Sequence, residues 1–148
     1  NGIKGLLYSS QIAVGEENNL RLRVYGEKGS LDWSQQEPNT LWFRSNSSAT
    51  QMIRSGVGEF SDSAQAAMRT PAGHPEGYLE AFANIYLNFV KQIRAFESAE
   101  PSDNETHDVP GIAEAIRGMA FIENAVAASS KESKWHEFKI DAAVLGER

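Results

Sequence analysis

The sequence predicts an α+β fold, with an open, largely antiparallel β-sheet and two long helices packed on one face of that sheet. Three observations support this prediction. Alternating apolar and polar residues fill the first third of the chain, between short turns. Two later segments carry apolar residues at intervals of three and four. Strands and helices therefore occupy separate parts of the chain, as they do in α+β domains.

The first strands are predicted from composition and alternation. Residues 4–14 are rich in Leu, Ile, Val and Tyr and contain no Pro. Residues 19–25 alternate, so that Arg21, Arg23 and Tyr25 share one side. The predicted strands are residues 4–14, 19–25, 30–34 and 40–44. Their short connections indicate an antiparallel meander.

The middle of the chain, residues 45–73, is predicted to be loose because it is rich in Ser, Ala, Gly and Thr, with room for one short strand at 52–54. The Gly-x-Gly at 56–58 reads as a loop, since a dinucleotide fingerprint needs a third glycine and a following apolar helix. Residues 97–110 form an acidic, Pro-containing loop.

The first long helix is predicted to start at Pro75, with Gly73 or His74 as its cap, and to run for roughly 20 residues. Its apolar stripe consists of Tyr78, Phe82, Ile85, Phe89, Ile93 and Phe96. The second helix is predicted over about 112–129. Alternation predicts a closing strand at 135–140, and residues 141–148 read as a tail.

Length and composition restrict the function. A chain of 148 residues fits one domain over residues 1–148. The absence of cysteine excludes a disulfide framework, a thiolate zinc site and a cysteine nucleophile. A net charge of −6 argues against nucleic-acid binding. The sequence has no apolar run long enough for a membrane span and no signal peptide. A cytoplasmic location is therefore expected. The sequence begins with Asn1 instead of Met and leads directly into strand-like sequence. We therefore expect this chain to be a piece of a longer protein.

Residues 73–78 are the strongest candidate site. They place the imidazole of His74 and the carboxylate of Glu76 at a predicted helix N-terminus, where backbone N–H groups attract anions or hydroxyl oxygens. The alternative is that His74 is only a cap and that Glu76 only offsets the helix dipole. Asp103 and His107 have the spacing of one helical turn, but their acidic surroundings favour a solvated loop. No metal site is therefore predicted.

The strand residues suggest a second surface. Arg21, Arg23, Tyr25 and Trp42 are predicted to lie on the sheet face that the helices leave open, which is either solvated or an interface. The two arginines are suited to phosphate or carboxylate, although solvated or interface pairs are commoner. The tryptophans form either a binding platform or part of a sheet core or interface. They are Trp33, Trp42 and Trp135.

Several motifs in a fixed order resemble one known family. The motifs are residues 10–13 (SQIA), 25–33 (YGEKGSLDW), 73–86 (GHPEGYLEAFANIY) and 117–123 (RGMAFIE). Together they resemble the C-terminal domain of the Gfo/Idh/MocA oxidoreductases, such as glucose–fructose oxidoreductase and inositol dehydrogenase. The resemblance extends from about residue 3 to residue 138.

The resemblance implies an NAD(P)-dependent oxidoreductase that acts on a sugar, polyol or related hydroxyl compound. Its cofactor-binding Rossmann domain and its catalytic lysine would lie upstream, so this chain would hold no catalytic residue, bind no cofactor alone and be inactive in isolation. The resemblance implies a substrate-binding role for His74, and we extend it to its neighbours Glu76 and Tyr78.

The open sheet face, with Arg21, Arg23, Tyr25 and Trp42, is expected to form a homodimer or homotetramer interface. The alternative is a non-catalytic carbohydrate-binding or assembly module.

Overall fold

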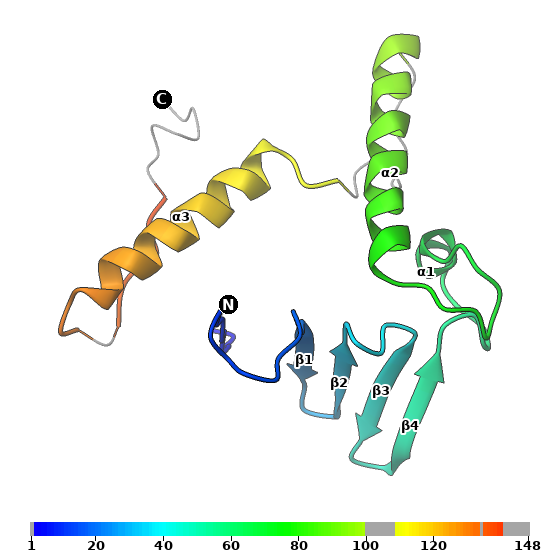
Figure 1. Cartoon of the computed structure of the whole chain (residues 1–148), viewed down its shortest axis with the longest axis horizontal. Coiled ribbons are helices and arrows are strands. Elements are labelled where there is room, and N and C mark those ends of the chain that lie inside the picture. The colour runs from blue at the N-terminus through cyan, green and yellow to red at the C-terminus, as the bar shows by residue number, and fades with distance from the viewer. Residues whose placement is uncertain (1, 100–108, 134, 141–148) are drawn as a thin grey trace. The chain divides into compact units, whose positions relative to one another are not determined.

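The computed structural model describes residues 2–99, 109–133 and 135–140. The elements in chain order are β1 (Arg21–Tyr25), β2 (Gly29–Ser34), β3 (Thr40–Ser45), β4 (Ser48–Arg54), α1 (Asp62–Ala67), α2 (Tyr78–Ser98) and α3 (Ile112–Ser129) (Figure 1). The chain divides into two compact units, residues 1–84 and 85–148. The expectation of one domain over residues 1–148 stays a prediction, as does the packing of the helices on one face of the sheet.

The first unit contains the predicted antiparallel sheet, with the strand order β1-β2-β3-β4. The register gives this sheet two different faces. Leu22, Trp33, Leu41 and Ile53 are consecutive cross-strand partners and form an apolar row. The opposite face carries Arg21, Arg23, Tyr25, Asp32, Thr40, Trp42, Arg44, Met52 and Arg54. The alternation seen in the sequence therefore corresponds to one apolar and one polar face.

Two predicted strands are wrong. Residues 4–14 and 135–140 are described and contain no strand. Their apolar side chains are exposed, with Leu6 at 96% and Trp135 at 88%. Strand-like composition is insufficient here because a strand needs a hydrogen-bonded neighbour, and no ladder to either segment forms among the described residues.

The middle of the chain is more ordered than predicted. The short strand expected at 52–54 is a seven-residue strand, β4, which pairs with β3 and has a register shift between Phe43 and Ser45. Residues 62–67 form α1, whose N-cap Ser61 accepts a hydrogen bond from the backbone N–H of Ala64 at 3.4 Å. The Gly-x-Gly between β4 and α1 is a turn, as expected, with a positive φ of 75° at Gly56.

The first long helix begins later than predicted. α2 starts at Tyr78, so neither Gly73 nor His74 caps it and Pro75 lies before it. The backbone N–H of Gly77 donates to the Glu80 carboxylate at 2.8 Å, which is half of a capping box. The preceding segment is held elsewhere, because the His74 carbonyl accepts a hydrogen bond from the Asn39 side chain at 3.2 Å. Tertiary hydrogen bonds therefore replace the first predicted turn of the helix.

The second unit contains most of α2 and all of α3, whose bounds agree with the prediction. Glu114 accepts a hydrogen bond from the backbone N–H of Gly111 at 3.0 Å and so caps the start of α3. Asn124 in α3 bonds both backbone groups of Lys139: its Nδ2 donates to the Lys139 carbonyl at 2.8 Å, and its Oδ1 accepts from the Lys139 N–H at 3.2 Å. One side chain thus takes the place of a strand partner for this segment.

Within the described part of the chain, no helix is long and apolar enough to cross a membrane. The predicted tail 141–148 and most of the acidic loop 97–110 lie outside the described residues.

Candidate functional site

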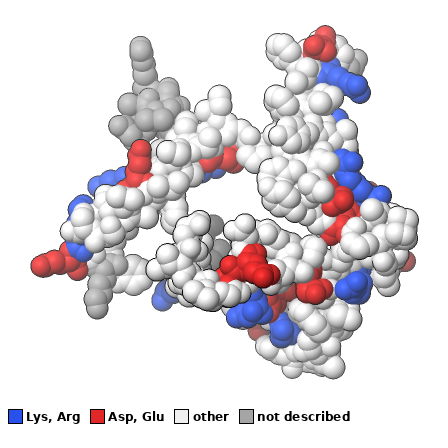
Figure 2. All heavy atoms as spheres, in the orientation of Figure 1, with Lys and Arg blue, Asp and Glu red and all other residues white. Residues whose placement is uncertain are grey.

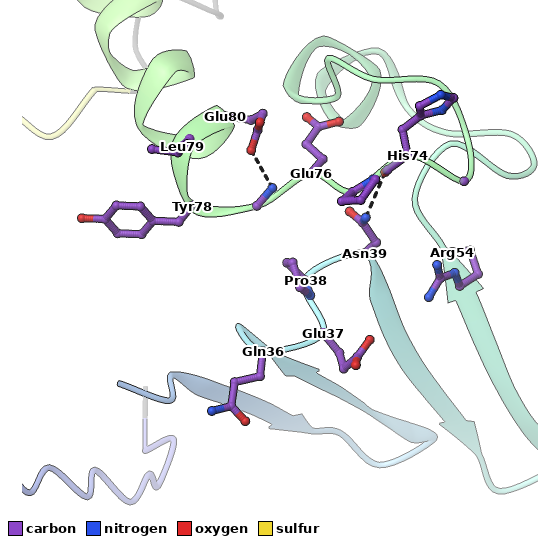
Figure 3. A pocket seen from close by; sticks show the side chains of 13 residues that line it. Gln36, Glu37, Pro38, Asn39, Arg54, His74, Glu76, Tyr78, Leu79 and Glu80 are labelled. Atoms are coloured by element: carbon purple, nitrogen blue, oxygen red, sulfur yellow. Dashed lines mark hydrogen bonds between the residues drawn. The ribbon is translucent and has the colours of Figure 1, made fainter. Parts of the chain in front are cut away.

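An open cavity of about 540 Å³ lies in the first unit, where three segments meet. One wall is the loop between β2 and β3, with Glu37 and Asn39. A second is Arg54 at the end of β4. The third is the segment 73–80, which leads into α2 (Figure 3). All three predicted substrate-binding residues line this cavity: His74, Glu76 and Tyr78. Their role in binding a substrate stays a prediction.

The Glu76 carboxylate holds the loop that carries His74. Its oxygens accept hydrogen bonds from the backbone N–H of Arg69 at 2.8 Å, and from the backbone N–H and hydroxyl of Thr70 at 2.9 and 2.8 Å. Burial acts to raise the pKa of Glu76, but these hydrogen bonds and the nearby Arg69 charge outweigh it and lower the pKa. Glu76 lies before α2 and accepts hydrogen bonds from Arg69 and Thr70, so it stabilises the loop and does more than offset the helix dipole.

Two further contacts within the first unit join α2 to this loop and to the end of α1. Arg69 Nε donates to the Asn84 side-chain oxygen at 2.6 Å, and Asn84 Nδ2 donates to the Ala67 carbonyl at 2.7 Å. On the other side, Gly77 lies against Pro38: a Cβ added at Gly77 would lie 3.2 Å from the Pro38 ring. The loop is therefore held both to the helix that follows it and to the β2–β3 loop.

His74 is exposed and is one of the residues that line the cavity. Its Nδ1 lies 3.2 Å from the Pro71 carbonyl oxygen. Because a carbonyl can only accept, this contact assigns the Nδ1 proton, and a neutral ring then offers Nε2 as an acceptor. No described residue is a hydrogen-bond partner of Nε2. The ring is thus oriented by its own loop while one nitrogen remains open to a ligand hydroxyl.

Polar and aromatic side chains from other positions also line the cavity. Arg54 Nη1 donates to the Thr40 hydroxyl at 2.6 Å, which fixes the guanidinium at the end of β4. Glu37 lies in the opposite wall. Tyr78 stacks obliquely on Phe82, with ring centroids 4.6 Å apart. Guanidinium, carboxylate and imidazole groups around one open cavity suit a ligand with several hydroxyl groups.

A second feature, missed by the sequence reasoning, lies on the polar sheet face. Asp32 is 6% exposed and accepts a bidentate pair from Arg21, from Nε at 2.9 Å and Nη2 at 2.8 Å. Arg23 and Arg44 each place one nitrogen 3.4 Å from Asp32 Oδ2. We call these four residues the arginine cluster. In Figure 2, basic and acidic side chains lie side by side over the strands.

The arginine cluster fixes the charge of Asp32. Hydrogen bonding from Arg21, joined by the charges of Arg21 and Arg23, outweighs the effect of burial and lowers the pKa of Asp32 to about 2. The same hydrogen bond raises the pKa of Arg21. Sequence alone contained one usable signal: in an antiparallel pair joined by the turn 26–29, Arg23 and Asp32 fall opposite each other.

The shared tryptophan platform finds less support in the geometry. Trp33 and Trp42 lie on opposite sheet faces, so they do not share a platform. The Trp33 indole donates to the Pro38 carbonyl at 3.0 Å, which gives it a structural role beside the cavity.

No cluster of three or more His, Cys, Asp or Glu side chains suited to a metal ion occurs among the described residues. Asp103 and His107 lie outside the described residues.

Comparison with known proteins identifies the class. The family described as "Oxidoreductase family, C-terminal alpha/beta domain", of the Gfo/Idh/MocA type, matches residues 1–138. The chain belongs to this family, as the motifs predicted. The uncharacterized oxidoreductase YfiI of Bacillus subtilis (strain 168) is 34% identical over 139 residues, which are 94% of this chain and 35% of that protein.

Solved structures agree. An oxidoreductase from Sinorhizobium meliloti is 38% identical, with a TM-score of 0.79 over 86% of this chain and 35% of its own. An inositol dehydrogenase homolog from Azotobacter vinelandii, complexed with NADH and myo-inositol, is 27% identical, with a TM-score of 0.78 over 87% of this chain and 34% of its own. The chain thus spans about a third of the length of these relatives.

Proposed function

We propose that this chain is the substrate-binding and assembly domain of an NAD(P)-dependent oxidoreductase that acts on a sugar, polyol or related hydroxyl compound. The observation that carries the proposal is the likeness to an inositol dehydrogenase homolog complexed with NADH and myo-inositol. The nicotinamide would supply hydride transfer from a Rossmann domain elsewhere in the longer protein. This chain would supply contacts to the substrate.

The cavity supports a role in binding hydroxyl groups. His74 Nε2 is open, and its ring is oriented through the Nδ1 contact with Pro71. Glu76 keeps the loop in place through Arg69 and Thr70, so its proposed contribution is to position His74. Tyr78 at the start of α2 presents a phenol at the other end of the same segment. We assign hydrogen bonding to a substrate hydroxyl to His74.

Kinetics of the full-length enzyme test this assignment. His74→Ala should raise the KM for the polyol about tenfold, the loss expected for one hydrogen bond to a ligand hydroxyl, and leave the KM for the cofactor unchanged. His136→Ala is the matched control, because that imidazole is exposed in the second unit and lies 3.3 Å from Lys131 Nζ. An unchanged polyol KM in His74→Ala contradicts the assignment.

The isolated 148-residue chain gives a second test. With NAD⁺ or NADP⁺ and myo-inositol it should form no reduced nicotinamide, since no hydride-transfer machinery is proposed here. Turnover by this chain would overturn the division of roles. Polyol binding without turnover in the full-length protein would favour the alternative, a carbohydrate-binding or assembly module.

The assembly role is assigned to the polar sheet face with Arg21, Arg23, Tyr25 and Trp42. The register places all four on the same face, and Tyr25 is 74% exposed, so the face offers aromatic area as well as charge. Light scattering should give the mass of a dimer or tetramer at micromolar concentration. A monomer mass would contradict this part of the proposal.

A further inference from the structure

The polar sheet face carries an excess of positive charge that its own residues leave uncompensated. Among the paired strand positions of this face, four arginines accompany the single carboxylate of Asp32. The arginines are Arg21, Arg23, Arg44 and Arg54. This local excess contrasts with the net charge of −6 for the whole sequence.

The geometry concentrates this charge at one point. Nitrogens of Arg21, Arg23 and Arg44 lie 2.8, 3.4 and 3.4 Å from the same oxygen, Asp32 Oδ2. The nitrogens of Arg23 and Arg44 are therefore no more than about 7 Å apart. One carboxylate faces three guanidinium groups, so the cluster retains two positive charges.

The arginine side chains around Asp32 also have more N–H donors than this carboxylate accepts. Arg21 uses its Nε and Nη2 on Asp32, whereas Arg23 and Arg44 each touch Asp32 with a single nitrogen at the long distance of 3.4 Å. A guanidinium has five N–H donors, and these two side chains are 44% and 45% exposed. No other ion-pair partner of either occurs among the described residues. Both therefore have donors directed to solvent on either side of a buried carboxylate.

We propose that Arg23 and Arg44 form a binding site for a doubly charged oxyanion such as phosphate, and that this anion joins two copies of the chain through the polar sheet face. The second part rests on the proposed assembly role. Two copies that pair through this face bring two clusters of surplus positive charge together, which is unfavourable unless an anion lies between them. A tetrahedral oxyanion accepts from two guanidiniums at this spacing.

Phosphate titration tests the site directly. Inorganic phosphate is titrated into the protein by calorimetry at constant ionic strength, so that general screening stays fixed. The double variant Arg23→Gln/Arg44→Gln should bind phosphate at least about tenfold more weakly than the unchanged protein. Arg117→Gln is the matched control: its guanidinium is 67% exposed in α3, it has one ion pair with Glu114, and its loss should leave phosphate binding unchanged. Equal binding by the double variant, or no binding by the unchanged protein, overturns the site.

Light scattering tests the link to assembly. At equal ionic strength, replacing chloride with phosphate or sulfate should tighten self-association of the unchanged protein about tenfold and that of the double variant hardly at all. Equal association in chloride and phosphate overturns the link but leaves the proposed assembly role standing. A monomer in every buffer overturns the assembly role and the link together, while the titration still decides the anion site. Circular dichroism of the double variant shows whether its sheet is intact.

Discussion

The carboxylate of Asp32 and the guanidinium of Arg21 form a bidentate pair across neighbouring strands, with nitrogen–oxygen distances of 2.9 and 2.8 Å. Asp32 is one of two buried residues in the described part of the chain, and the other, Thr40, is polar too. The most enclosed point of the described sheet is thus on its charged face, where arginine side chains cover a carboxylate.

Replacing Asp32 tests this arrangement through pH. The pKa of Asp32 is lowered from 3.8 to about 2 in the folded chain, so the unfolded chain binds its proton at higher pH. Its contribution to stability is therefore complete above about pH 4, falls as the pH drops, and is lost near pH 2. Asp32→Asn should lower the urea midpoint at pH 7, and the difference from the unchanged protein should shrink steeply as the pH falls from about 4 towards 2. A constant difference across this range would contradict the pairing.

Removing the charge of Glu76 should loosen the loop of the cavity. Glu76→Gln weakens three hydrogen bonds to Arg69 and Thr70, and we expect a loss of roughly 1–2 kcal/mol in the free energy of unfolding. Urea unfolding measures it. Glu137→Gln is the control, because Glu137 is 78% exposed in its ion pair with Lys139 and should change stability by less than about 0.5 kcal/mol. Because the pKa of Glu76 is lowered in the folded chain, the difference should begin to shrink as the pH falls below the ordinary glutamate pKa and should be lost as the pH passes the lowered value.

Two glycines should respond to the same substitution in opposite ways. A Cβ at Gly29 in β2 would overlap the backbone carbonyl of Arg44 on the neighbouring strand. Gly29→Ala should therefore cost at least about 1–3 kcal/mol, as overpacking does. Gly118 lies inside α3 with open space around its Cβ position, so Gly118→Ala should stabilise the chain by about 0.5–1 kcal/mol. Thermal unfolding of both variants checks the contrast, and a stabilising Gly29→Ala would show that the strands move apart readily.

Asn124 should control the order of the segment that follows α3. Asn124→Ala removes both hydrogen bonds to Lys139, and Asn124→Asp removes the donor while keeping the acceptor. Amide exchange at Lys139 should accelerate most in Asn124→Ala, which removes the acceptor of that N–H. It should accelerate less in Asn124→Asp, which removes only the hydrogen bond to the Lys139 carbonyl. Unchanged exchange in Asn124→Ala would mean that the segment is held by other contacts.

The sequence was most informative where structure depends on local pattern. Alternation located β1, β2 and β3 within one or two residues, and the periodic apolar stripe located α3. Alternation failed for residues 135–140, because the same pattern occurs in a segment that a single helix side chain, Asn124, holds by its backbone. Pairing partners are a property of the fold and are invisible to a local pattern.

The site was predictable in part for the same reason. His74, Glu76 and Tyr78 were found together because they are close in sequence, and the cavity does bring them together. Arg54 and Glu37 reach the cavity from other elements, and no local signal predicted this. The start of α2 was misplaced because Pro75 is a good first helical residue, whereas Asn39 and Pro38 hold the chain before it in another path.

The outer strands of the described sheet, β1 and β4, differ in how they would receive a foreign strand. The unpaired backbone groups of an edge strand can pair with a strand from another chain, and charged side chains along the edge suppress this pairing. β1 carries two positive charges, Arg21 and Arg23, which both lie in ion pairs with Asp32 of the neighbouring strand. β4 carries no charge before Arg54 at its end. Fibrillar growth from a partly unfolded chain would therefore start at β4. Thr50→Lys would place a charge on this edge strand and suppress such growth.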